Sequence, residues 1–206
     1  MAASRVELHK GDLPDNLRFQ GAVAIDTETL GLRPHRDRLC LVQLSAGDGT
    51  AHLVQIAAGQ HSAPRLTAAL VDPALIKIFH FARFDVAVLK HNLGVDARNV
   101  YCTKIASKLA RTYTDRHGLK DITAELLGIE LSKQQQSSDW GAEHLSQQQL
   151  TYAASDVLHL HALMAKLDVM LVRQGRTELA ARCFEFLATR AALDLAGFEE
   201  FDIFAH

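Results

Sequence analysis

The sequence feature that most constrains the fold is an apolar run that ends in two acids. Residues 21–29 read G-A-V-A-I-D-T-E-T, a pattern typical of a buried β-strand. In an extended strand, Asp26 and Glu28 project from the same face, where their like charges repel. Hard divalent cations would neutralise that repulsion, and sheet proteins tend to place ligands at the carboxyl ends of strands. The run therefore predicts either a ligand site on a core strand or a strand-end turn with solvated acids.

The segments around this strand predict a domain with strands first and helices last. Apolar runs, Gly-rich turns and helical spacing predict strands over 39–45, 51–56 and 74–80, and helices over 64–70, 84–94, 103–112, 118–127, 146–173 and 177–195. This order is that of an α/β or α+β domain. A length of 206 residues fits one globular domain over 1–206, with a core of about 20–175 followed by a C-terminal helix and tail over 177–206.

Composition excludes several classes of protein. The chain has 22 Lys and Arg against 24 Asp and Glu, a net charge of −2, which argues against holding long nucleic acid through its overall field. The sequence contains no apolar run long enough for a membrane span and no secretory-signal pattern at its start. Cys40, Cys102 and Cys183 form no CxxC pair and are expected to be reduced thiols. These features predict a cytoplasmic protein.

Three further polar residues lie in apolar surroundings. Asp85 stands near the start of the helix expected over 84–94, where an acid also complements the helix dipole. Tyr152 and Asp156 are four residues apart and therefore share one helix face. Taken singly, each has an ordinary structural explanation: a dipole-complementing Asp, a half-buried Tyr and a surface Asp.

Taken together, Asp26, Glu28, Asp85, Tyr152 and Asp156 resemble a known family pattern. The ordered set D-T-E, then F-D, then Y-x-x-x-D, is similar to the DEDDy group of 3′-to-5′ exonucleases, the superfamily that includes RNase D. The resemblance covers about residues 20–175 and extends to the stretch before Trp140. It is closest to the nano-RNase C branch of that group. That closer match is carried by the sequences of 25–40, 102–120, 132–140 and 202–206.

The resemblance implies a fold, a reaction and an assembly. The fold would be RNase H-like, with a mixed five-stranded sheet flanked by helices and a helical C-terminal part. Asp26, Glu28, Asp85 and Asp156 would hold two Mg²⁺ or Mn²⁺ ions, and Tyr152 would orient or deprotonate the attacking water. The expected reaction converts short RNA, especially dinucleotides, to nucleoside 5′-monophosphates, and the expected assembly is a homo-oligomer, an octamer. The alternatives are an exonuclease on longer RNA or DNA, and a catalytically silent nucleic-acid-binding module.

Four residues are candidates for contacting the substrate. Leu32 stands where relatives place an apolar wedge between the last two bases, although a leucine folded into the core is the alternative. His80 adjoins the second motif and is a candidate phosphate contact or a buried strand-end histidine. Thr27, between the first two acids, and Lys133, ahead of Trp140, complete the set. At position 81 many relatives have Asn, whereas this chain has Phe81.

Three other patterns have less specific meanings. The chain has eleven histidines but no HExxH motif, so we expect no metal centre built from histidines. Six basic residues gather between positions 98 and 121, and they predict either a strip that contacts phosphate or another subunit, or a solvated helix face. They are Arg98, Lys104, Lys108, Arg111, Arg116 and Lys120. The tail contains Phe198, Phe201, Ile203 and Phe204, which predict docking onto the domain or a neighbouring subunit.

Overall fold

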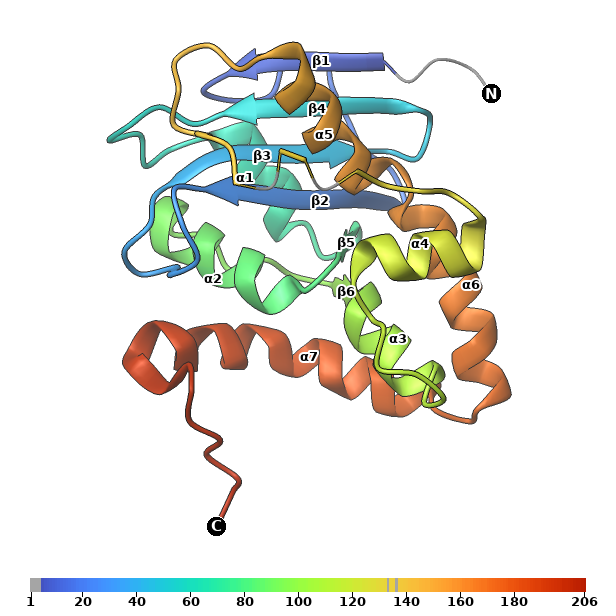
Figure 1. Cartoon of the computed structure of the whole chain (residues 1–206). Helices are drawn as coiled ribbons and strands as arrows, with labels where there is room; N and C mark the ends of the chain where they lie inside the picture. Colours follow the sequence, from blue (N-terminus) through green and yellow to red (C-terminus); the bar gives the residue numbers. More distant parts are fainter. Residues whose placement is uncertain (1–4, 133, 136) are drawn as a thin grey trace.

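One mixed sheet of six strands organises the computed structural model, which describes residues 5–132, 134–135 and 137–206 (Figure 1). The strands are β1 (Arg5–Lys10), β2 (Ala22–Thr29), β3 (Leu39–Ser45), β4 (Thr50–Gln55), β5 (Ile76–Phe79) and β6 (Val100–Cys102). They lie in the order β1-β4-β3-β2-β5-β6. β3 is antiparallel to β2 and β4, whereas β1 pairs in parallel with β4, and β5 pairs in parallel with β2 and β6.

The expected α/β architecture is confirmed, but the sheet has six strands rather than five. The local sequence patterns indicated neither outer strand, β1 nor β6. β1 reads R-V-E-L-H-K, and its polar side chains mask the usual apolar signal of a strand. β6 is only three residues long, too short to give a strand pattern, and it runs directly into the helix that was predicted from residue 103.

Seven α-helices and a π-helical turn are formed by the described residues. The helices are α1 (Pro64–Val71), α2 (Ala82–Leu93), α3 (Thr103–Ala110), α4 (Leu119–Leu127), α5 (Gln147–Leu158), α6 (Leu160–Arg173) and α7 (Thr177–Leu193), and the turn is Asp194–Phe198. The single helix predicted over 146–173 is therefore two helices. They are separated by His159, whose backbone angles of φ −108° and ψ −6° lie outside regular α-helical values.

Two hydrophobic cores cover the two faces of the sheet. Helices α1, α2 and part of α7 pack on one face, where Val23 and Ile25 of β2 point. Helices α3 to α6 pack on the other, where Ala24 points, and α5 crosses this face in the front of Figure 1. Because side chains alternate along a strand, Asp26 and Glu28 belong to the face that α5 covers.

The chain beyond the π-helical turn leaves the body of the domain (Figure 1). Phe198, Phe201, Ile203 and Phe204 are substantially exposed, and the ring centroid of Phe204 lies 6.1 Å from that of Phe186. Within the described residues, no helix is both long and apolar enough to cross a membrane.

Candidate active site

Strand β2 and helix α5 together bring three predicted acids to one point. β2 presents Asp26 and Glu28, and α5 presents Asp156 from the helix that crosses the same face. Ligand-capable oxygens of these three carboxylates lie within 4.8 Å of one another. The position of α5 is fixed at its start by Ser146 and Gln149, which cap the helix reciprocally. Residues separated by more than 120 positions thus form one acidic centre.

Asp85 joins this centre from the other side of β2. It is almost fully buried near the start of α2, and its Oδ1 accepts a 2.7 Å hydrogen bond from the Thr27 hydroxyl. Thr27 points away from its neighbours Asp26 and Glu28 along the strand, so its hydroxyl can hold Asp85 in place. The structure therefore gives Thr27, predicted as a substrate contact, a hydrogen bond to a predicted metal ligand.

All four acids have pKa values above the ordinary range of a carboxyl group. Burial raises the pKa of Asp26 to about 7, and burial together with the charges of the other three acids raises that of Glu28 to about 10. Burial and the Asp26 charge also raise the pKa values of Asp85 and Asp156. These shifts measure how unfavourable it is to gather four negative charges at this place.

The described part of the chain supplies no lysine or arginine ion pair to any of the four acids. Gln43 is buried and donates to Asp26 at 3.3 Å, which is a neutral contact. Carboxylate oxygens are hard ligands that suit Mg²⁺ or Mn²⁺ better than Zn²⁺. The donor set therefore fits divalent cations of the kind expected from the sequence.

Tyr152 lies one helical turn before Asp156 and is partly buried. Burial, followed by the charges of Asp156, Glu28 and Asp26, raises the pKa of its hydroxyl well above the usual value. Its ring centroid lies 6.0 Å from that of Trp140, which is itself buried. The Tyr152 hydroxyl is consequently protonated at neutral pH and suited to donating a hydrogen bond.

A cavity of about 630 Å³ opens over the acids and collects most of the predicted substrate contacts. Leu32 lines it and is 86% exposed, which excludes a leucine folded into the core. His80 lines it too, with Nδ1 2.9 Å from the Thr103 hydroxyl oxygen, and burial lowers the pKa of His80 to about 3. His80 is therefore neutral at physiological pH. Lys133 lies outside the described residues.

The lining of the same cavity also includes residues that were not predicted as site residues, among them four large side chains: Phe81, Phe84, Lys104 and Lys120. Phe81 has φ 69°, a left-handed conformation in which a bulky residue is uncommon, and the Lys104 ammonium lies 4.2 Å from the centre of its ring. Sequence signals existed for three of them. Lys104 and Lys120 belong to the basic stretch, and Phe81 is the departure from the family pattern.

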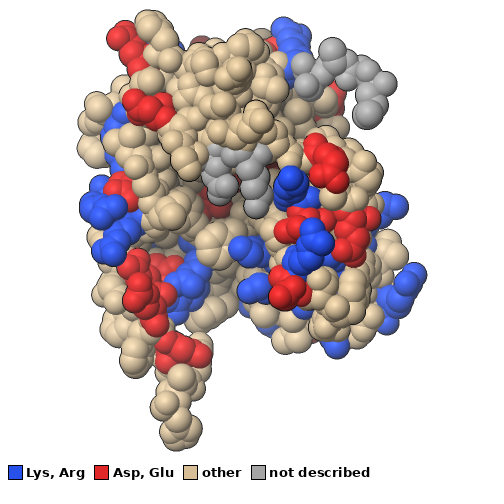
Figure 2. Space-filling model, viewed as in Figure 1, with Lys and Arg blue, Asp and Glu red and all other residues tan. Residues whose placement is uncertain are grey.

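The basic stretch does not form one continuous strip. Arg111 is buried and bonded to Glu125, and Arg116 pairs with Asp121 at 2.7 Å, so these two are structural. Lys104 and Lys108 are one turn apart on α3 and have no ion pair with any described residue. Figure 2 likewise shows Lys and Arg interspersed with Asp and Glu over this face of the molecule.

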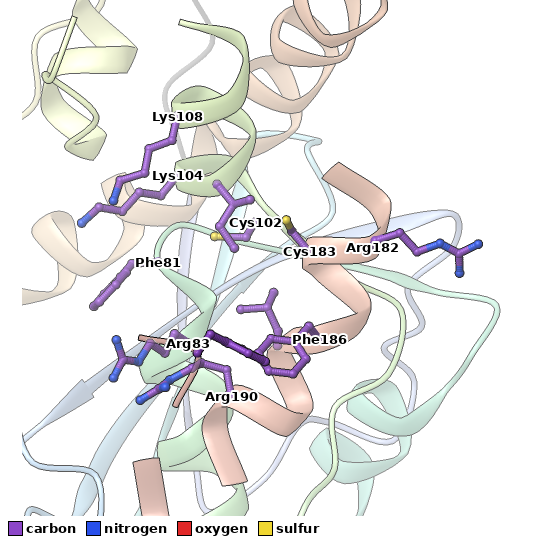
Figure 3. A pocket seen from close by; sticks show the side chains of 12 residues that line it. Phe81, Arg83, Cys102, Lys104, Lys108, Arg182, Cys183, Phe186 and Arg190 are labelled. Atoms are coloured by element: carbon purple, nitrogen blue, oxygen red, sulfur yellow. The ribbon is translucent and has the colours of Figure 1, made fainter. Parts of the chain in front are cut away.

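A second cavity, of about 540 Å³, adjoins the first between α2, α3 and α7 (Figure 3). Phe81 and Lys104 line both cavities and thus separate them. Apolar groups such as Phe186 and Leu187 line the second cavity. Its basic lining residues are Arg83, Lys104, Lys108, Arg182 and Arg190.

Comparison with known proteins places these features in a family context. A family model described as 3′-5′ exonuclease matches residues 11–172. Ribonuclease D of Gluconacetobacter diazotrophicus is 35% identical over 81% of this chain, and that of Granulibacter bethesdensis is 34% identical over 78%. This chain spans only 42% and 40% of the lengths of these two relatives.

Solved structures match the fold over nearly the whole chain. NrnC of Brucella melitensis bound to pGG is 61% identical, with a TM-score of 0.95, and the match covers 99% of this chain and 100% of that one. The same protein with bound Mg²⁺ is 61% identical, with a TM-score of 0.93, over 98% and 99% of the two chains. RNase D of Escherichia coli is 28% identical, with a TM-score of 0.75, over 84% of this chain and 45% of that one.

Proposed function

Because the chain belongs to the 3′–5′ exonuclease family, we propose that it hydrolyses short RNA from the 3′ end, dinucleotides above all, to nucleoside 5′-monophosphates. The observation that carries this proposal is the group formed by Asp26, Glu28 and Asp156, with Asp85 beside it. These acids converge beneath a cavity, and no described lysine or arginine forms an ion pair with them.

The four acids would hold two divalent cations, Mg²⁺ or Mn²⁺. Bound there, the cations would supply activation of a water molecule and stabilisation of the leaving 3′-oxygen. The chain's own contribution is to hold the carboxylates in place, through the Thr27 hydrogen bond to Asp85 and the capped helix that carries Asp156. A Mg²⁺-bound structure of a 61% identical relative supports this assignment.

Tyr152 would position the attacking water rather than remove its proton. A general base must lose its own proton near the working pH, and the pKa of Tyr152 is far above neutrality. A protonated hydroxyl next to Asp156 can instead hold the water by a hydrogen bond.

Three observations support a short substrate. The cavity over the acids has the volume typical of a site for a small ligand. Leu32 lines this cavity and is exposed, so its side chain can stack against the face of a base, a contact that does not depend on which base is present. A 61% identical relative has been solved bound to pGG. His80 and Lys133 are further proposed substrate contacts, with neutral His80 serving as a hydrogen-bonding group.

We further propose that the protein is a cytoplasmic homo-oligomer, an octamer. The exposed aromatic residues of the tail support an assembly, because exposed apolar groups gathered in one segment usually mark a contact surface. The thiols of Cys40, Cys102 and Cys183 are free, as in a reducing compartment. Light scattering tests the assembly, and a monomeric mass would overturn it.

The second cavity favours a different substrate, a longer strand of RNA or DNA. A strand with its 3′ end over the acids could continue past Phe81 into a space lined by cations. Lys104 and Lys108 are suited to contacting its phosphates, because no described acid forms an ion pair with either. On this alternative, affinity would rise with strand length.

A length series distinguishes these substrates. We would follow hydrolysis of 5′-labelled RNA and DNA, from two to about twenty nucleotides, with Mg²⁺ or Mn²⁺. Fastest turnover of the dinucleotide supports the proposal, whereas faster turnover of the 20-mer overturns it. Lys108→Ala should leave dinucleotide hydrolysis unchanged, and it should raise the KM of the 20-mer only if long strands use the second cavity. Lys166→Ala, an exposed lysine on α6, is the matched control.

A further inference from the structure

A second group of metal-ligating side chains lies at the edge of the sheet, away from the catalytic acids. Glu7 and His9 come from β1, and His52 comes from the neighbouring β4. Glu7 lies directly opposite His52 in the pairing of the two strands, and His9 is two residues further along the same face. The three side chains lie on the face of the sheet that Phe19 helps to cover, which is opposite to the face that carries Asp26 and Glu28.

The three ligand atoms already lie at nearly the spacing that a small cation requires. His9 Nε2 is 3.2 Å from His52 Nδ1, which is 3.4 Å from Glu7 Oε2, and the third side of the triangle is 4.0 Å. A tetrahedral ion bound at about 2.0–2.1 Å separates its nitrogen and oxygen ligands by roughly 3.3 Å. Only small side-chain movements would be needed to close the triangle around an ion.

The charges of the cluster also suit a cation. Burial lowers the pKa values of both His9 and His52, so both imidazoles favour the neutral form that binds metals. Glu7 supplies a negative charge, and its other oxygen is held 2.7 Å from Arg5. One proton shared between the two imidazoles leaves the Glu7 oxygen without a donor, whereas one cation can bind all three atoms.

We propose that Glu7, His9 and His52 bind a single transition-metal cation of the Zn²⁺ class, with water as the fourth ligand. Two imidazoles and one carboxylate form a ligand set typical of Zn²⁺ and its neighbours, unlike the all-oxygen set of the catalytic acids. The ion would join edge strand β1 to β4 and would take no part in hydrolysis. The sequence predicted no such centre, because His9 and His52 are 43 positions apart and belong to no motif.

Cobalt provides a spectroscopic test, since four-coordinate Co²⁺ absorbs strongly in visible light. Metal-free protein carrying Asp156→Asn would be titrated with Co²⁺ in excess Mg²⁺, so that the catalytic acids compete poorly for cobalt. We expect one equivalent of bound Co²⁺ with a four-coordinate spectrum. His9→Gln and His52→Gln should each weaken binding by on the order of 10²-fold or more. His91→Asn, on the exposed side of α2, is the matched control and should bind normally.

Thermal unfolding tests the same site without spectroscopy. With Zn²⁺ about one hundredfold above its Kd, the midpoint of the protein with an intact cluster should rise by roughly 5–10 °C. Glu7→Gln should remove most of that rise while leaving Mg²⁺-dependent hydrolysis unchanged. A Co²⁺ spectrum that is the same in His52→Gln and in its parent overturns the proposal. So does an unshifted midpoint with Zn²⁺, which would assign the cluster to hydrogen bonding alone.

Discussion

Acidic side chains at two places in this molecule have opposite electrostatic surroundings. Asp194 is buried just after α7, where Arg83 donates to it at 2.6 and 2.8 Å and Arg190 at 2.6 and 3.0 Å. Two guanidinium groups thus face one carboxylate. Asp85, in the same first turn of α2 as Arg83, belongs with its three neighbours to a group of four carboxylates that has no ion pair with a described lysine or arginine.

The difference shows which part of the chain serves stability and which serves chemistry. At Asp194 the protein neutralises a buried charge with its own side chains, and the result joins α2 to the end of α7. At the acidic centre no described basic side chain neutralises the four carboxylates, and their mutual repulsion lowers the stability of the fold. An arrangement that lowers stability is not explained by the needs of folding. Perturbed carboxyl groups in a cavity are typical of a functional site.

The largest expected effect follows from removing one of the four acids that have no described basic partner. Asp156→Asn should lower the rate of hydrolysis by on the order of 10³-fold or more, because a metal ligand is worth several kcal/mol to the transition state. It should also leave the metal-free protein as stable as before or more stable, because repulsion is relieved. Single-turnover hydrolysis and thermal unfolding in chelator measure the two effects.

The matched control is Asp115→Asn, which neutralises an exposed acid outside the cavity and should change neither quantity. If Asp156→Asn kept more than a few per cent of the activity, Asp156 would not be a metal ligand. If it destabilised the metal-free protein, the acids would resemble Asp194 and the contrast between the two groups would fail.

Removing the hydroxyl of Tyr152 should have a smaller effect on the rate of hydrolysis. Tyr152→Phe should reduce the rate by about 10²-fold, the scale of a positioned hydrogen bond to the attacking water. The carboxylates remain, so the rise in unfolding midpoint caused by Mg²⁺ should persist. An unchanged rate would show that Tyr152 serves only to pack against Trp140.

Removing the charge of Asp194, which has two basic partners, should change stability in the opposite direction. Asp194→Asn leaves two guanidinium groups without their acid, and we expect it to lower the free energy of unfolding by about 2 kcal/mol. Hydrolysis per folded molecule should be unchanged. Denaturant titration measures the loss, with Asp202→Asn in the exposed tail as the control. A variant as stable as its parent would mean that the two ion pairs add nothing beyond their own desolvation.

Much of the acidic centre could be predicted, because its residues lie in locally informative segments. An apolar strand ending in Asp26 and Glu28 was expected over 21–29 and is found at Ala22–Thr29. The spacing of Tyr152 and Asp156 placed both on one helix face, as observed in α5. In each case a short run of sequence determines both the element and the direction of the side chains.

Contacts between distant segments could not be predicted in this way. The hydrogen bond between Thr27 and Asp85 joins residues 58 positions apart, and nothing in either segment indicates the other. The pairing of β1 with β4, which brings His9 to His52, depends on an edge strand whose polar residues hide it. The charge of Arg111 was visible, whereas its burial against Glu125 depends on the packing of α3 and α4.

The smallest expected effect is the pH dependence of the metal-free protein. Burial raises the pKa of Asp26 to about 7, so the folded protein retains a proton that the unfolded chain has lost above about pH 4. Stability from this group is therefore present at low pH and is lost as the pH rises through 7. Between pH 6 and 8 in chelator, we expect this group to lower the unfolding midpoint by roughly 2–5 °C, measured as the difference between the parent and Asp26→Asn.

Saturating Mg²⁺ should abolish or reverse this slope, because protons and cations compete for the same oxygens. Asp26→Asn should reduce it in chelator, since the variant carries no titrating group at that position, whereas Glu28, with its pKa raised to about 10, still contributes. The buried His80 acts in the opposite sense: its pKa is lowered to about 3, so it destabilises the fold as the pH falls below about 7, where an unfolded histidine takes up a proton. Comparing the parent with Asp26→Asn separates the two contributions, because both proteins contain His80. If the midpoint changed equally with pH in the parent and in Asp26→Asn, solvent or nearby side chains would neutralise Asp26. The acidic centre would then be compensated as Asp194 is.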